Sequence, residues 1–191
     1  NISKEIASVL TISALNTNSQ VGILCYSNQK ELFIQSKKGP SHGYRIIKNL
    51  YELKQKSSKT DLSRMIKFFM KTIKKKSLVV LISDFIDKDY HKNLSALAKK
   101  HDVICLHIFD DYETKIPDLG LIELEEKENN FKKWINTSSK EFKKLSQNLF
   151  ISKPEKLKKE MGSIGINYLK INSKENYIKN LIKLFKYRKN K

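Results

Sequence analysis

The 191-residue chain contains no long apolar run, which excludes a membrane-spanning helix within it. Such a helix needs about 20 apolar residues, and the longest strongly apolar stretch is Leu78 to Ile82. Cysteine is also scarce, because only Cys25 and Cys105 occur, both in apolar segments typical of strands. Thiols of this kind favour a reduced cytoplasmic protein over a disulfide framework. The first residue is Asn1 and no charged-then-apolar leader follows it, so we expect a fragment without a signal peptide.

The sequence also lacks the short motifs that mark the common enzyme classes. It has no Cys-x-x-Cys pair, no His-Glu-x-x-His helix and no glycine-rich loop that could cradle a phosphate. These absences remove the most familiar dithiol redox sites, zinc sites and nucleotide sites. They predict a protein that is not an enzyme.

Acidic residues are few relative to basic ones, and the formal net charge is +18. A charge of this sign raises nucleic acid or an anionic membrane as a partner. Only Arg45, Arg64 and Arg188 among the 38 basic residues are arginines, however, and the lysines are spread along the whole chain. Because the arginine fork is preferred for reading bases and clamping phosphates, this pattern favours solvated lysine-rich faces over a specific nucleic-acid site.

Hydrophobic periodicity divides the chain into helices and strands, and its length suits one domain over residues 1–191. Apolar residues at three- and four-residue steps predict helices, whereas short apolar runs predict strands. The expected helices cover residues 3–16, 43–53, 61–75, 89–101, 138–161 with a break before Pro154, and 173–184, the last capped by Ser173. The expected strands cover residues 21–27, 31–35, 78–83, 103–109, 121–125 and 165–171.

The order of these elements predicts an α/β fold. The first two strands form a hairpin whose second member lies at a sheet edge, because it is the more polar of the two. The later strands alternate with helices, which implies parallel pairing and right-handed crossovers. We therefore expect a doubly wound, mostly parallel, Rossmann-like sheet with helices on both faces.

Several aromatic and imidazole side chains are expected to have structural roles. His107 alternates with apolar neighbours in a strand and should be packed, and His101 should lie at a helix C-terminus. His42 and His91 are expected at the surface. Trp134 could be an exposed anchor, although packing under the last helices is favoured.

Two oxygen-bearing side chains fall where a doubly wound sheet binds ligands, beyond the carboxyl ends of its strands. Thr60 ends the polar loop 57–60 and precedes a helix, and Asp84 ends the strand 78–83. A hydroxyl and a carboxylate form part of a shell for Mg²⁺ or Mn²⁺, which takes oxygen ligands and retains water. Simpler explanations are that Thr60 caps the helix and that Asp84 caps a turn. Asp110 and Asp111 end the next strand, where we expect local hydrogen bonding.

At these residues the sequence resembles a known family. Ser83-Asp84, preceded by the turn Thr60 to Leu62, is similar to parts of the metal-ion-dependent adhesion site of von Willebrand factor A domains. Nearly the whole chain resembles the bacterial family known as domain of unknown function fifty-eight. The matching stretches are Val79 to Phe85, Leu97 to Val103, Asp111 to Glu113 with Ile116-Pro117 and Gly120, Gly165-Ile166, and Leu184-Phe185 with Arg188.

The resemblance implies a von Willebrand A-type fold with Thr60 as a direct or near-direct metal ligand and Asp84 as a ligand through water. The family pattern opens with a central strand ending in Asp-x-Ser-x-Ser, and this chain begins only after it. The retained half-site should therefore hold metal weakly. Either the parent protein continues upstream, with a possible membrane anchor there, or the strands 21–27 and 78–83 pair directly with each other in the sheet.

The favoured function is a cytoplasmic protein-interaction module in which a partner carboxylate completes the metal coordination. Residues flanking the two ligands, namely Ser58, Lys59, Asp61 and Phe85, are expected to contact that partner. By the resemblance, the partner is an AAA+ ATPase of the MoxR type that works in complex assembly or maturation. The alternatives are a Mg²⁺-dependent phosphoesterase that uses Asp84 and Asp110, and a salt-sensitive nucleic-acid binder that depends on charge alone.

Overall fold

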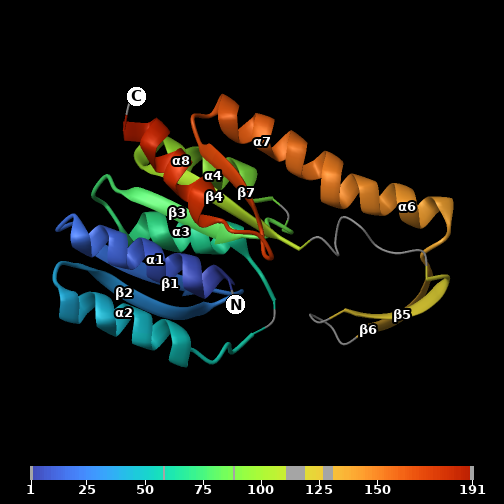
Figure 1. The fold of residues 1–191 in the computed structure, drawn as a ribbon, viewed down its shortest axis with the longest axis horizontal. Coiled ribbons are helices and arrows are strands. Elements are labelled where there is room, and N and C mark those ends of the chain that lie inside the picture. Colours follow the sequence, from blue (N-terminus) through green and yellow to red (C-terminus); the bar gives the residue numbers. More distant parts are fainter. Residues whose placement is uncertain (1, 58, 88, 111–118, 127–130, 190–191) are drawn as a thin grey trace. The chain divides into compact units, whose positions relative to one another are not determined.

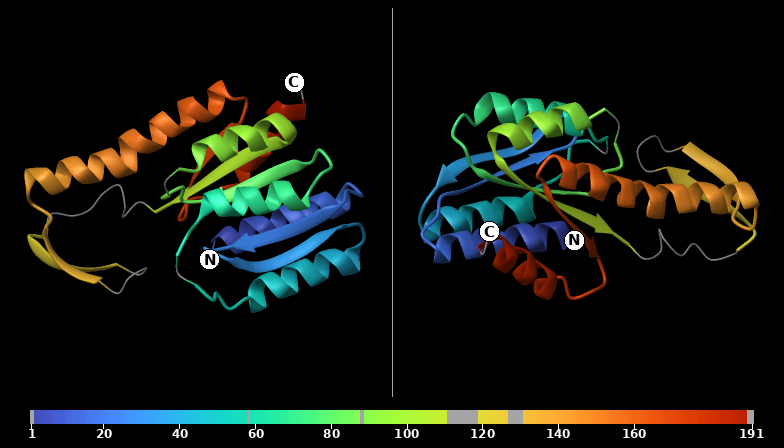
Figure 2. Two further views of the ribbon diagram at one scale, coloured as in Figure 1. Left: turned by 180° about the vertical axis from the view of Figure 1, so that it is seen from behind. Right: turned by 90° about the horizontal axis from the view of Figure 1, so that it is seen from above.

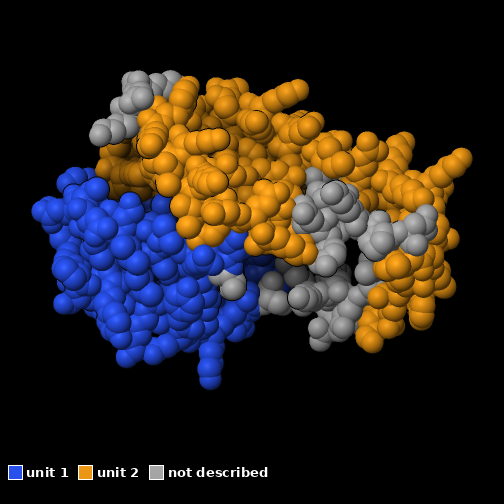
Figure 3. All heavy atoms as spheres, viewed as in Figure 1, with its two compact units in different colours: residues 1–75, 86–97 blue, residues 76–85, 98–191 orange. Residues whose placement is uncertain are grey.

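The structure is a computed structural model, and it describes residues 2–57, 59–87, 89–110, 119–126 and 131–189 (Figure 1). The chain divides into two compact units, which have different colours in Figure 3. Unit 1 contains residues 1–75 and 86–97, and unit 2 contains residues 76–85 and 98–191.

The helices are α1 (Ile2–Asn16), α2 (Pro40–Glu52), α3 (Leu62–Thr72), α4 (His91–Lys100), α6 (Lys140–Gln147), the π-helix η1 (Asn148–Ser152), α7 (Lys153–Ser163) and α8 (Ile178–Lys189). The strands are β1 (Val21–Tyr26), β2 (Lys30–Lys37), β3 (Leu78–Ser83), β4 (Asp102–Phe109), β5 (Leu121–Glu126), β6 (Phe131–Asn136) and β7 (Asn167–Asn172). The chain is thus a mixture of helices and strands, as predicted. No described helix has the length and apolar character needed to cross a membrane.

Unit 1 is built on the antiparallel hairpin β1–β2, which the sequence predicted. Helix α3 covers one face of the hairpin, where the Phe68 ring lies 6.1 Å from the Tyr26 ring and 5.9 Å from the Phe33 ring. Helices α1 and α2 pack against each other and cover the other face (Figure 2). Successive side chains of a strand point to opposite faces, so the apolar run of β1 from Ile23 to Tyr26 offers apolar side chains to helices on both sides.

Helices α1 and α2 approach each other closely at Gly43. A Cβ atom added to Gly43 would lie 2.1 Å from the Leu15 Cδ1 atom, which is far closer than real atoms pack. The absence of a side chain at this position therefore allows the two helices to meet.

Unit 2 contains the parallel sheet β3–β4–β7, with β4 in the middle. Parallel strands are usually covered on both faces and are therefore apolar throughout, and Ile104, Cys105 and Leu106 of β4 are each 0% exposed. In register, Ser83 lies beside His107, and His107 beside Lys170. Helices α7 and α8 pack against β7. Cys105 is buried and Cys25 is partly buried, and both are free thiols, as the sequence predicted in place of a disulfide.

Arg188 ties the last helix to the beginning of the sheet. Its guanidinium donates to the Asp102 carboxylate at the start of β4 and to the Asn167 side-chain oxygen at the start of β7. The Arg188 side chain is only 18% exposed, so the ion pair with Asp102 is largely shielded from water on the arginine side. Arg188 therefore holds together three elements of unit 2.

Several expectations about the second half of the chain are wrong. Strand β5 does not join the parallel sheet but pairs antiparallel with β6, a strand that the sequence did not reveal. The predicted break before Pro154 is absent, because η1 joins α6 to α7 and the wide π turn accommodates a residue without an N–H donor. Helix α8 begins at Ile178 rather than after Ser173, whose hydroxyl donates to Asp110 over 3.0 Å instead of capping a helix.

Two side chains also differ from expectation. His42 is 8% exposed rather than at the surface, and its Nε2 lies 2.8 Å from the Val21 carbonyl oxygen. Trp134 is 62% exposed, so the favoured packing role does not hold. Of the two alternatives left open for the strands near 21–27 and 78–83, direct pairing is not found among the described residues, because β1 and β3 belong to separate sheets.

Candidate metal-binding edge

Thr60 lies in unit 1, exposed, directly before the helix α3. Asp61, not Thr60, caps this helix, because its Oδ1 accepts a 2.7 Å hydrogen bond from the Arg64 N–H. The Asp61 N–H in turn donates to the Ser27 carbonyl oxygen over 3.2 Å, just beyond the end of β1. The residue after Thr60 is therefore bound just beyond the carboxyl end of β1. The simpler explanation that Thr60 caps α3 is wrong, because Asp61 is the capping residue.

A second carboxylate, that of Asp87, also binds the start of α3. Its Oδ2 accepts a 2.6 Å hydrogen bond from the Leu62 N–H, one of the N–H groups that a helix leaves without an internal partner. Nearby, the Asn93 side chain donates to the Ser63 hydroxyl over 2.5 Å. Both contacts lie within unit 1. Sequence reasoning missed Asp87, although an acidic residue shortly after the end of β3 could have suggested it.

The loop before Thr60 is held by Glu31 of β2. Its carboxylate accepts from the Ser27 hydroxyl over 2.6 Å and from the Lys56 N–H over 3.1 Å. The hydrogen bond from Ser27 lowers the pKa of Glu31 below its ordinary value. Among the predicted partner-binding residues, Lys59 is exposed and its N–H donates to the Ser57 hydroxyl over 3.2 Å. Ser58 lies outside the described residues.

Asp84 lies in unit 2, exposed at the end of β3. The Ser83 hydroxyl organises this end: it lies 3.4 Å from Asp84 Oδ1 and accepts a 3.0 Å hydrogen bond from the Phe85 N–H. Phe85 was predicted to contact a partner, but its side chain is only 3% exposed. A buried ring offers a partner little surface, so the structure assigns Phe85 to the support of the strand end.

His107 lies beside the strand end and is packed, as predicted. Its side chain is 6% exposed, and its Nδ1 is hydrogen-bonded to the Tyr168 hydroxyl. Burial lowers the pKa of His107 to about 4, with a further lowering by Lys170 and an opposing effect of Asp84. The imidazole is therefore neutral at neutral pH.

Asp110 follows β4 and binds the segment after β7. Its Oδ2 accepts from the Ser173 hydroxyl over 3.0 Å, and its Oδ1 lies 3.5 Å from the Lys174 ammonium. The expectation that Asp110 bonds locally is wrong, because these partners lie far along the chain. Asp111, expected in the same loop, lies outside the described residues.

The two predicted ligands suit a hard cation by their chemistry. Thr60 offers a hydroxyl oxygen and Asp84 a carboxylate oxygen, the kinds of ligand that Mg²⁺ and Mn²⁺ prefer. The two residues belong to different units. Among the described residues, no three histidine, cysteine or acidic side chains gather into a metal-binding cluster. The binding of a metal by Thr60 and Asp84 therefore stays a prediction from the sequence.

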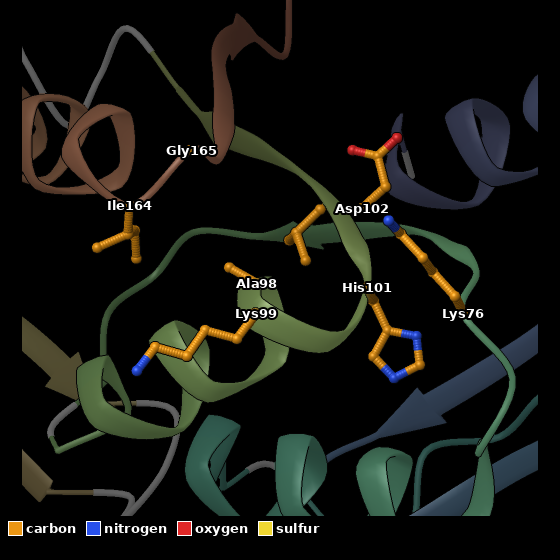
Figure 4. A pocket seen from close by; sticks show the side chains of 8 residues that line it. Lys76, Ala98, Lys99, His101, Asp102, Ile164 and Gly165 are labelled. Carbon is orange, nitrogen blue, oxygen red and sulfur yellow. The ribbon is translucent and has the colours of Figure 1, made fainter.

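Unit 2 contains a pocket of about 270 Å³ (Figure 4). The pocket lies at the opposite end of the strands from Asp84. Asp102 begins β4, Lys76 precedes β3, and Gly165 precedes β7, so the pocket is at the amino end of the sheet. Its lining residues are Lys76, Ala98, Lys99, His101, Asp102, Val103, Ile164 and Gly165. Asp84 follows the carboxyl end of β3, so this pocket is separate from that residue.

Comparison with known proteins gives a family but no activity. Residues 1–151 match the family described as "Protein of unknown function DUF58". The "Uncharacterized protein Rv1480" of Mycobacterium tuberculosis is 22% identical over 129 residues, which covers 65% of this chain and 41% of that protein. The "Uncharacterized protein Mb1516" of Mycobacterium bovis matches to the same extent. The "Uncharacterized protein MAV169" of Mycobacterium avium is 28% identical over 69 residues, or 36% of this chain and 41% of that protein.

This chain thus spans less than half the length of these relatives. No solved structure shows significant similarity to it.

Proposed function

Because the chain belongs to the DUF58 family, we propose that it is part of a von Willebrand A-like module that binds a protein partner through a divalent metal. In the complete module the sheet would be doubly wound, with a further central strand that contributes the other metal ligands. Thr60 and Asp84 would hold Mg²⁺ or Mn²⁺, and a partner carboxylate would complete the coordination. The module would act in the cytoplasm, and it would bind its partner without catalysing a reaction.

The hydrogen bond between Asp87 and Leu62 is the observation that supports this proposal. Leu62 follows Thr60 closely in the chain, and Asp87 follows Asp84 closely. The 2.6 Å contact between the Asp87 carboxylate and the Leu62 N–H therefore joins the segment that follows Asp84 to the start of the helix that follows Thr60. Both groups of this contact lie within unit 1.

The metal would supply positive charge that attracts a carboxylate of the partner. Residues of this chain would position it: Asp61 fixes the start of α3 beside Thr60, and Ser83 fixes the backbone beside Asp84. Lys59 is exposed in the adjoining loop and would favour an acidic partner surface.

The metal site can be tested by titrating Mn²⁺ into the chain and measuring free Mn²⁺ by electron paramagnetic resonance. We expect weak binding that falls at least about tenfold in Thr60→Val and in Asp84→Asn, because each removes one oxygen donor. Asp89→Asn and Thr17→Val remove a carboxylate and a hydroxyl at other exposed positions and serve as matched controls. Equal affinity in all five proteins would contradict the proposal.

The partner can be tested with purified AAA+ ATPases of the MoxR type. We expect a complex that forms in Mg²⁺, dissociates in EDTA and is weakened by Asp84→Asn. The same samples should be assayed for phosphate ester hydrolysis. Turnover that Asp84→Ala abolishes would contradict the proposal that the protein is not an enzyme. A complex that persists in EDTA would contradict the proposal that binding of the partner depends on a metal.

A further inference from the structure

Phe85 has an unusual backbone conformation at the point where β3 ends. Its φ angle is +54°, in the left-handed region that bulky side chains rarely adopt. Such a residue keeps this conformation only when its surroundings hold it there. Because the peptide between Asp84 and Phe85 is planar, holding the Phe85 backbone in place also fixes the position of the Asp84 backbone that carries the carboxylate.

The Phe85 ring is held by two aromatic side chains of the parallel sheet. Its centroid lies 5.6 Å from the His107 ring in an edge-to-face arrangement and 6.5 Å from the Tyr168 ring. Phe85 is only 3% exposed, so the ring is enclosed as well as contacted. The ring therefore anchors the strained backbone from the side of the sheet.

His107 is itself fixed in place. Its Nδ1 and the Tyr168 hydroxyl form a hydrogen bond, and the two rings meet edge-to-face at 5.7 Å. His107 is 6% exposed, and a buried imidazole that lost this partner would carry the cost of an unmet polar group. The hydrogen bond thus holds the ring orientation against which Phe85 packs.

We infer that His107 and Tyr168 are positioning residues for Asp84, acting through the Phe85 ring to hold its left-handed backbone. The chain of contacts runs from the Tyr168 hydroxyl to the His107 imidazole, then to the Phe85 ring and the peptide that carries Asp84. Its functional meaning rests on the proposed metal site, whereas the contacts themselves lie within unit 2. Neither His107 nor Tyr168 would touch the metal or the partner.

The structural part can be tested by hydrogen exchange of the backbone amides of residues 84–87. Tyr168→Phe keeps the ring and removes the hydroxyl, and we expect exchange there to accelerate at least about threefold, since the Phe85 N–H would open more often. Tyr187→Phe, at a tyrosine that is 61% exposed, is the matched control and should change nothing. Unchanged exchange in Tyr168→Phe would overturn the inference.

A double-mutant cycle separates positioning from simple packing. His107→Phe keeps an aromatic ring but removes Nδ1, so we expect it to accelerate exchange as Tyr168→Phe does. The double variant should be no worse than either single one, because both remove the same hydrogen bond. The inference would be overturned if the effects of the two substitutions on exchange were additive, or if His107→Phe left exchange unchanged.

Mn²⁺ titration then tests the link to the metal site. We expect Tyr168→Phe to weaken Mn²⁺ binding several-fold while Tyr187→Phe leaves it unchanged. If Asp84→Asn weakens binding and Tyr168→Phe does not, the inference fails and the proposed function stands. If the wild-type chain binds no Mn²⁺, the proposed function fails, and the exchange measurements alone decide whether the pair positions Asp84.

Discussion

Asp87 shows how much one side chain can contribute at the start of a helix. Helix α3 already has a capping residue in Asp61, yet the Leu62 N–H donates to the Asp87 carboxylate. Two negative charges therefore lie at the positive end of the helix dipole. This arrangement joins the segment after β3 to α3 within unit 1.

Replacing Asp87 should destabilise the protein by about 1–2 kcal/mol. Asp87→Ala removes both the acceptor for the Leu62 N–H and the charge at the helix start, whereas Asp87→Asn keeps an acceptor and should cost less. The free energy of unfolding can be measured in urea. Asp89→Asn is a fitting control, because Asp89 is exposed and its φ of +59° suits asparagine as well as aspartate. An equal loss in the control would contradict the assignment.

The buried His107 should make stability fall in mild acid. The unfolded chain protonates an imidazole near pKa 6.5, whereas burial holds the pKa of His107 at about 4 in the folded protein. Between these pH values the unfolded state binds more protons, so the free energy of unfolding falls as pH falls, by up to about 3 kcal/mol for this group.

The measurement is urea unfolding at pH values from 7 to 4 without added metal. His107→Gln should show a shallower loss than the wild type, and His91→Gln, at an exposed histidine, should follow the wild type. His101, whose pKa burial also lowers, contributes in the same direction to all three proteins. Parallel curves for His107→Gln and the wild type would refute the prediction.

Single residues were the hardest part of the protein to predict from the sequence. His42 is buried because its ring reaches the Val21 carbonyl oxygen, a contact between distant segments that no local pattern reveals. Phe85 flanks the predicted ligand Asp84 and was therefore expected to contact a partner, yet tertiary packing encloses it. In both cases long-range contacts decided the outcome.

At the scale of elements, the contact between α1 and α2 depends on Gly43. We expect Gly43→Ala to cost about 1–3 kcal/mol, because the new methyl group would meet the Leu15 side chain. Gly162→Ala in α7 is the matched control, since nothing lies within 4 Å of its added Cβ, and it should stabilise by about 0.5–1 kcal/mol.

Thermal or urea unfolding measures both changes. Adding Leu15→Ala to Gly43→Ala should relieve the clash, so that the double variant loses less than the sum of the single losses. A stabilising Gly43→Ala would show that the helices do not meet at this residue.

Elements that are apolar on both faces were predicted well. Strand β3 was expected over residues 78–83 and occupies those residues, and β4 begins one residue before its expected start. The sequence could not show that β5 leaves the sheet, because its partner β6 is rich in charged and polar residues and carries no clear strand pattern. Ser173 looked like a helix cap, but its hydroxyl binds Asp110 instead.

At the scale of the whole molecule, the net charge of +18 predicts weak, salt-sensitive attraction to DNA. Binding that depends on released counterions falls steeply with salt. We expect fluorescence anisotropy to detect binding to random duplex DNA at about 20 mM salt and to lose it by about 150 mM. Affinity that survives at the higher salt concentration, or that depends on DNA sequence, would favour a nucleic-acid function.

The candidate site could be predicted only in outline. The sequence located Thr60 and Asp84 because each adjoins a recognisable element, and the structure leaves both exposed. It did not reveal Glu31, Asp87 or His107 as supports, because their partners lie in other elements. The sequence motifs identify the side chains that would bind the metal. Tertiary packing determines which other side chains hold the neighbouring backbone in place.

The π-helix η1 between α6 and α7 determines what a change in chain length would do to the direction of α6. A π turn holds one more residue than the matching α-helical turn, so Asn148–Ser152 behaves as an insertion of a single amino acid. Deleting one residue there would rotate α6 about its axis by about 100° relative to α7. Its solvent-facing lysines would then point in a new direction, and small changes in length at this position could redirect an entire charged surface.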